Sequence, residues 1–243
     1  AIGFGTLTDN TTGANNTALG LNSLANNTTA NSNTAVGTNS LVANTTGADN
    51  VAVGRNAYDA NTTGHSGVAI GESSLTTNTT GLRNVAVGQN CMAVNTTGAE
   101  NVAMGRNALD ANTTASNNVA IGDSALTLAT TAAKNTAIGS GAGASVTTGG
   151  FNVLVGIDSG DTLTTGDTNI LIGNTARTSA SGGANQISMG VVVTCVGDDN
   201  FTFGNQGTDS NIAFGATSIT APSDIRLKED IQDEEVGLDF IND

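Results

Sequence analysis

Hydrophobic positions recur along this chain every 17 residues. The three residues before each repeat glycine are apolar, small and apolar, as in Val51-Ala52-Val53 and Val119-Ala120-Ile121. This alternation, with β-branched outer residues, predicts a short strand. A second apolar position follows four residues after the glycine, and then comes Asn-Thr-Thr-Gly, as in residues 61–64, which is typical of a turn. Each repeat is therefore expected to form a strand, a glycine bend, a second extended piece and a turn.

The spacing of the repeat glycines does not drift. They are Gly3, Gly20, Gly37, Gly54, Gly71, Gly88, Gly105, Gly122, Gly139, Gly156, Gly173 and Gly190. A fixed short period is the signature of a solenoid. The sequence thus predicts an all-β protein whose residues 1–190 form a parallel β-solenoid, a β-roll or β-helix with 17-residue coils. Twelve coils stacked about 4.8 Å apart would make a rod of roughly 55–60 Å.

The two faces of the expected strand differ in size, which suggests how the rod assembles. We expect the valines and isoleucines to face inward and the line of alanines, from Ala18 to Ala137, to face outward. A thin coil has few large side chains to offset the backbone entropy of ordering 17 residues, about 1–2 kcal/mol each. The smooth alanine face would let another copy pack closely. A homotrimer is the expected assembly.

Other repeated positions predict packing rather than chemistry. Asparagine opens most repeats, from Asn16 to Asn169 with Gly67 as the exception, and stacked repeats would align these amides into a ladder. Cys91 occupies a position that holds serine or alanine in other repeats. We expect it to be a buried free thiol.

Composition narrows the function classes. The 243 residues include 32 Gly but no Trp, one Tyr and six Phe, which suits a narrow interior better than a compact globular core. The formal net charge is -14 with seven Lys and Arg, which argues against binding nucleic acid. One His and two distant Cys predict neither a metal site nor a cofactor. The sequence contains no apolar run of membrane-spanning length. Residues 1–3 match the end of a repeat, so we expect a fragment of a longer protein.

The repeat changes near its C-terminal end. Gly204 and Gly215 keep the motif but follow the preceding repeat glycine by 14 and 11 residues. Three phenylalanines, Phe201, Phe203 and Phe214, lie here. We expect residues 191–222 to form a cap in which these bulky side chains close the core. From residue 223 onward the chain is acidic, which predicts a separate segment, either a short helix or an irregular linker.

Two motifs together resemble a known family. The repeat Asn-Thr-Ala-Val-Gly-x-Asn-Ser-Leu-x-x-Asn-Thr-Thr-Gly, residues 33–47, resembles the repeats of bacteriophage tail fibres and, more distantly, the coils of trimeric autotransporter adhesin heads. The segment Ser-Asp-Ile-Arg-Leu-Lys, residues 223–228, resembles the start of the self-cleaving intramolecular chaperone that follows endosialidases and many tail fibres. Residues 223–243 would then be the beginning of that domain.

The resemblance implies a trimer folded with help from a C-terminal domain that is later released. It implies that Ser223 is the nucleophile and that Lys228 is its base, which a serine hydroxyl needs and which burial of the lysine would permit. The residues alone favour a different interpretation, in which Ser223 caps a helix and Lys228 is a solvated side chain. Only twenty residues follow Ser223, far fewer than the family's chaperone domain has.

These expectations favour a structural protein of the virion, outside the host cell. The leading function is the trimeric shaft of a tail fibre that contacts other tail proteins and a host receptor such as a surface glycan. One alternative is a bacterial trimeric adhesin, although residues 224–243 show neither heptads nor barrel strands. Another is an ice-binding solenoid, because the Thr-Thr pairs of the turns would stack into rows. Catalysis on an external substrate is not expected, since the scattered carboxylates of Glu72, Glu100, Asp110 and Asp123 form no evident pair.

Overall fold

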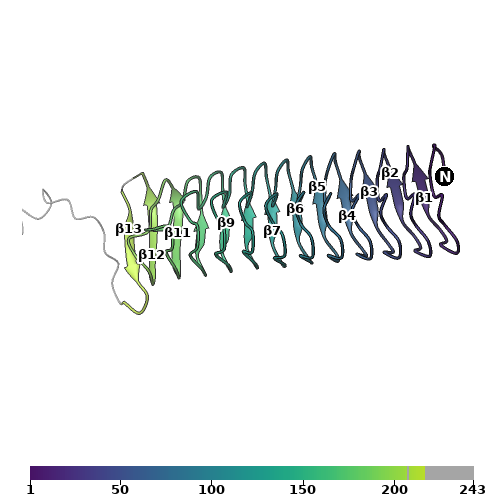
Figure 1. Ribbon diagram of the computed structural model, residues 1–243. Helices are drawn as coiled ribbons and strands as arrows, with labels where there is room; N and C mark the ends of the chain where they lie inside the picture. The colour runs from purple at the N-terminus through teal and green to yellow at the C-terminus, as the bar shows by residue number, and fades with distance from the viewer. Residues whose placement is uncertain (207, 217–243) are drawn as a thin grey trace, which may run out of the picture.

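The chain folds into a straight stack of coils in which each 17-residue repeat makes one turn (Figure 1). This computed structural model describes residues 1–206 and 208–216. Those residues contain no helix, and twelve of their thirteen strands pair in parallel in sequence order. The predicted all-β parallel solenoid with 17-residue spacing is therefore confirmed.

The first ten strands have three residues each and the last three are longer. The strands are β1 (Thr17–Leu19), β2 (Thr34–Val36), β3 (Val51–Val53), β4 (Val68–Ile70), β5 (Val85–Val87), β6 (Val102–Met104), β7 (Val119–Ile121), β8 (Thr136–Ile138), β9 (Val153–Val155), β10 (Ile170–Ile172), β11 (Gln186–Val191), β12 (Asn200–Asn205) and β13 (Ser210–Ala213).

Hydrogen bonds join neighbouring coils along nearly the whole repeat, not only along the strands. In the second extended piece, the Tyr58 N–H donates to the Ser74 carbonyl at 2.9 Å. In the turn, the Thr62 N–H donates to the Thr79 carbonyl at 3.0 Å. Each coil thus satisfies its backbone donors and acceptors through the coils on either side, as buried backbone groups require.

The repeat glycine is required by its backbone conformation and by its neighbours. Gly54 has φ 141°, and a Cβ built on it would lie 2.4 Å from the carbonyl oxygen of Gly71. A residue with a side chain would be strained by the φ value and would clash with backbone that cannot move aside. The positive φ and the close approach of the next coil together explain why glycine recurs at this position every 17 residues.

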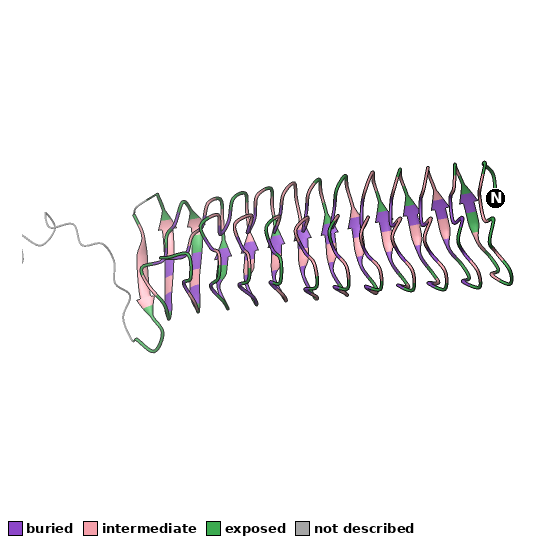
Figure 2. Ribbon diagram, viewed as in Figure 1, coloured by how far each residue is buried: buried purple, intermediate pink, exposed green. Residues whose placement is uncertain are grey.

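The prediction that the valines and isoleucines face inward and the alanines outward is wrong. The central alanines, such as Ala52 and Ala69, are completely buried, whereas the flanking valines and isoleucines are partly exposed (Figure 2). The interior is narrow because the second extended piece of each coil, which we call the second wall, faces the strands. It directs large side chains inward, including the buried Leu75 and Leu109. Only a small residue fits opposite that wall. The alanine line therefore cannot be an outer packing face.

Two later coils exchange large and small residues across this interior. Leu154 and Leu171 occupy the central strand position, where earlier strands have alanine. Gly143 and Gly160 stand in the second wall, where earlier coils have leucine or another large residue. A Cβ at Gly143 would lie 2.6 Å from a methyl group of Leu154. The exchange keeps the packed volume nearly constant, which is the kind of core change that proteins tolerate best.

In the region expected to form the C-terminal cap, the phenylalanines do not fill the interior. In β12 the side chain of Thr202 is buried, while Phe201 and Phe203 are only partly buried, with ring centroids 5.1 Å apart. Phe214 is exposed. The phenylalanines therefore do not close the core. The stack ends instead because β13 pairs antiparallel with β12 and covers its free edge, a common way to protect an edge strand.

Candidate functional site

The predicted catalytic pair cannot be placed in this structure. Ser223 and Lys228 lie outside the described residues, as does the whole segment 223–243. Their roles stay predictions that rest on the sequence.

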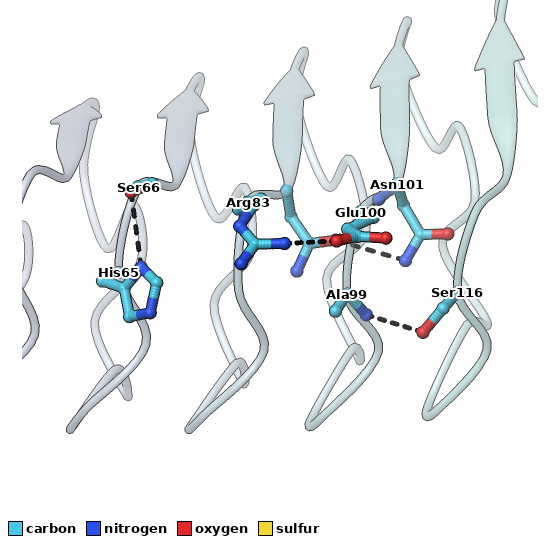
Figure 3. Close-up of polar contacts among 8 residues, drawn as sticks. His65, Ser66, Arg83, Ala99, Glu100, Asn101 and Ser116 are labelled. Carbon is cyan, nitrogen blue, oxygen red and sulfur yellow. Dashed lines mark hydrogen bonds and ion pairs between the residues drawn. The ribbon is translucent and has the colours of Figure 1, made fainter.

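Carboxylates that could have served as acid–base groups instead pair with arginines of adjacent coils. Glu72 pairs with Arg55, and Asp123 accepts a hydrogen bond from Arg106 Nε at 2.8 Å. Figure 3 shows Arg83 of one coil directed at Glu100 of the next. These pairs join residues 17 positions apart and are exposed, so each contributes roughly 0–1 kcal/mol.

Further titratable groups give no sign of catalytic or metal chemistry. In the described part of the chain, no three His, Cys, Asp or Glu residues gather into a possible metal site. Cys91 and Cys195 are free and buried, as expected for Cys91, and burial raises their thiol pKa to about 12 and about 11. Such thiols stay protonated and unreactive at neutral pH. The same residues include no helix with the length and apolar character needed to cross a membrane.

The expected ladder of opening asparagines is present in the interior. Asn50 Nδ2 donates to the Gly64 carbonyl of its own coil at 2.9 Å, and the Asn50 N–H donates to Asn33 Oδ1 of the preceding coil at 3.0 Å. Asn118 makes the equivalent bonds to Ala132 and Asn101. Each amide thus closes its own coil and fixes the distance to its neighbour.

A second amide ladder, which the sequence analysis missed, runs through the Asn-Thr-Thr-Gly turns. Asn61 Nδ2 donates to Asn44 Oδ1 at 2.8 Å, and Asn95 Nδ2 donates to Asn78 Oδ1 at 2.6 Å. These asparagines are completely buried. Their recurrence in consecutive repeats was the available signal, but turn composition alone accounted for asparagine at that position.

The two threonines of each turn have different surroundings. The first hydroxyl donates to a carbonyl of the next coil, as Thr45 Oγ1 does to Thr62 at 3.0 Å. The second threonine, such as Thr46 or Thr63, is exposed. The second threonines therefore form an exposed row, and the first threonines form a partly buried row whose hydroxyls are hydrogen-bonded.

The outward residues of the strands form a uniform surface along the rod. We call it the strand strip: the first and third residues of β1 to β10, continued by Ile187 and Met189 of β11. Every member is apolar or threonine, and the members include no charged residue. Large members remain open to solvent, with Ile70 39% and Met104 42% exposed. Contiguous apolar patches of this kind mark interaction sites.

No protein-family model matches the sequence, and no curated protein or solved structure matches it either.

Proposed function

We propose that this chain forms the shaft of a bacteriophage tail fibre, built from three copies and involved in attachment to the host. The single observation that carries the proposal is the unbroken stack of coils, which gives a rod of constant cross-section (Figure 1). Such a rod suits a spacer that holds a receptor-binding tip away from a particle.

The bonding within the rod supports a mechanical role. Backbone bonds repeat from coil to coil, and two amide ladders run through most of the stack, as the Asn33–Asn50 and Asn44–Asn61 bonds illustrate. Both ladders are interrupted where Tyr58 and Gly67 depart from the repeat. Each bond contributes about 0.5–1.5 kcal/mol net, and many act together along the stack. A rod of this kind resists bending without needing a wide hydrophobic core.

The C-terminal motif supports the assignment to tail fibres rather than to other solenoids. Residues 223–228 follow the last coils directly, at the place where the resembled family begins its chaperone domain. The proposal therefore includes maturation by one self-cleavage at Ser223. It includes no reaction on an external substrate. The partners are other copies of the chain, neighbouring tail proteins and a host receptor, for which a surface glycan is the expected class.

Purified virions provide the test. Antibodies raised against the rod should label fibres that project from the particles of a phage carrying the gene, and free rod should reduce adsorption of that phage to its host. Labelling of a bacterial outer surface in cells free of phage would instead favour a cell-surface adhesin and would overturn the tail-fibre proposal.

A further inference from the structure

We infer that the strand strip is the face along which copies of this chain pack, with the rods parallel and in register. The inference deepens the proposed function, because it names the interface of the proposed shaft. It replaces the alanine line, which lies in the interior, as the contact surface.

The strand strip is continuous along the rod. Strand pairing is in register from β1 to β11, so the outward residues form two straight columns with a constant spacing. The columns reach the cap, where Ile187 is followed by Phe201 and Met189 by Phe203. The matching partner for such a face is another rod with the same repeat, because a globular surface has no equivalent period.

The area of the strand strip is also large enough to contribute to an interface. Eleven strands about 4.8 Å apart and columns about 7 Å apart give a flat face of about 500 Å² once side-chain width is included. If the rims on either side of the strip are included, the contact area rises toward the roughly 800 Å² per partner of a standard interface. A lone rod would leave this apolar face in water along its whole length.

Charged residues lie on the two rims of the strip, just before and just after the strands. Asp49 lies two residues before β3 and Arg55 lies two residues after it. Glu100 and Arg106 have the same relation to β6. In a parallel, in-register contact, the residues that precede each strand of one rod lie beside the residues that follow the same strand of its neighbour. Asp49 then faces Arg55, and Glu100 faces Arg106.

Other arrangements bring like charges together. In an antiparallel pair with full overlap of β1 to β11, β6 lies opposite itself, so Glu100 would face Glu100 and Arg106 would face Arg106. A parallel, in-register contact through the outer side of the second wall would place Asp59 opposite Asp59 and Asp110 opposite Asp110. Like charges across an interface oppose association. Arg55, Glu100 and Arg106 also pair with Glu72, Arg83 and Asp123 of their own rod, so the rim charges favour the parallel arrangement without deciding it alone.

A matched pair of substitutions tests the face. Val53 on the strip is 36% exposed and Val94 on the second wall is 41% exposed, so lysine at either position should leave one rod folded. In the full chain, Val53→Lys should weaken association at least tenfold, measured by light scattering after gel filtration, whereas Val94→Lys should not. Circular dichroism of both variants checks that the β-structure is kept.

Single cysteines test the orientation. Val53→Cys and Ile172→Cys lie seven strands apart, about 34 Å along the rod. Each variant alone should be linked between chains by a short bis-maleimide, and a mixture should give no link between residues 53 and 172. The buried Cys91 and Cys195 stay in place, and the parent chain is the control.

Each outcome separates this inference from the proposed function. Association that survives Val53→Lys, or cross-links formed only in the mixture, would overturn the interface while leaving the tail-fibre proposal to the virion test. A parent chain that stays monomeric at tens of micromolar would overturn both the interface and the three-copy assembly of the proposed shaft, whereas the role in the virion would still be decided by antibody labelling. Loss of association only in the strip variant, with links only between identical positions, would support it even if antibodies failed to label virions.

Discussion

The ring of Tyr58 fills the space that a side chain at residue 67 would occupy. A Cβ built on Gly67 would lie 2.6 Å from the Cε1 and the hydroxyl oxygen of Tyr58. Tyr58 stands in the second wall where adjacent repeats have leucine, and Gly67 replaces the asparagine that opens the other repeats. The Tyr58 hydroxyl donates to the Gly81 carbonyl and accepts from Asn78 Nδ2, both at 3.2 Å. The two departures from the repeat therefore compensate each other.

This pairing predicts strong coupling between the two positions. Gly67→Asn alone should lower the free energy of unfolding by about 1–3 kcal/mol, because the new side chain overpacks the interior against Tyr58. Tyr58→Leu combined with Gly67→Asn should recover that loss, because it restores the ordinary repeat. Chemical denaturation of the single and double variants gives the coupling energy. Additive effects of the two substitutions would show that they do not share one space.

The facing of the strands can be checked with two alanines. Ala103, at the centre of β6, is completely buried, whereas Ala111 on the second wall is partly exposed. Ala103→Leu should destabilise the rod by about 1–3 kcal/mol through overpacking, and Ala111→Leu should change stability by less than about 0.5 kcal/mol. Equal effects in thermal melts would contradict an interior alanine column.

Asn95 tests the second amide ladder. Its Nδ2 donates to Asn78 Oδ1, and its Oδ1 accepts from Asn112 Nδ2 at 2.7 Å. Asn95→Ala leaves buried partners without bonds, and each such group costs about 1–3 kcal/mol, so we expect a loss of about 2–4 kcal/mol. Thr97→Ala, at an exposed position of the same turn, is the control and should be nearly neutral. A small effect of Asn95→Ala in denaturant melts would mean that the ladder adds little.

Asp110 predicts the sign of a pH effect. Burial raises the pKa of its carboxyl above the ordinary aspartate value. The folded rod therefore binds this proton more readily than the unfolded chain does. Stability from this group should be fully present below the unfolded pKa, near about pH 4, and should be lost as the pH rises through the higher folded pKa.

Asp110→Asn should accordingly raise the melting temperature at neutral pH and reduce the gain that the parent shows on acidification. Asp123→Asn removes the partner of Arg106 and should give no such gain at neutral pH. Melting curves of the three proteins between about pH 4 and pH 7 decide the matter. Lower stability of Asp110→Asn at pH 7 would contradict the predicted sign.

The proposed self-cleavage makes a separate prediction. In the complete gene, the parent chain should be cut at Ser223, while Ser223→Ala and Lys228→Ala should each leave full-length chains that still associate. The serine supplies the nucleophile and the lysine must take its proton. Denaturing gels followed by mass spectrometry of the new terminus give the result. An alanine variant that is still cut at the same place would rule out the dyad.

The sequence predicted the period, the strand positions and the opening amide ladder, because each follows from a repeated local pattern. It did not predict which strand face lies inside. Alternation in Val51-Ala52-Val53 distinguishes two faces, but the width of the interior decides between them. That width depends on the second wall, whose leucines project across the coil toward the alanines.

The remaining differences also arise from contacts between distant parts of the repeat. Asn61 could be explained as a turn residue, and nothing local to it shows that its amide is buried against Asn44. The phenylalanines of β12 could be explained as core residues, although the buried position between them is Thr202. No described residue bears on Ser223 or Lys228, so that part of the candidate site stays a prediction.

Because the coils are bonded to one another along the rod axis, tension applied to the two ends of one rod would load those bonds in series. The same force would act on every junction, so the weakest junction would open first. Each coil that peeled away would release 17 residues, or roughly 55–60 Å of extended chain. A single rod stretched in an optical trap should therefore lengthen in equal steps, and neighbouring copies bound along its length would carry the load past any coil that opened.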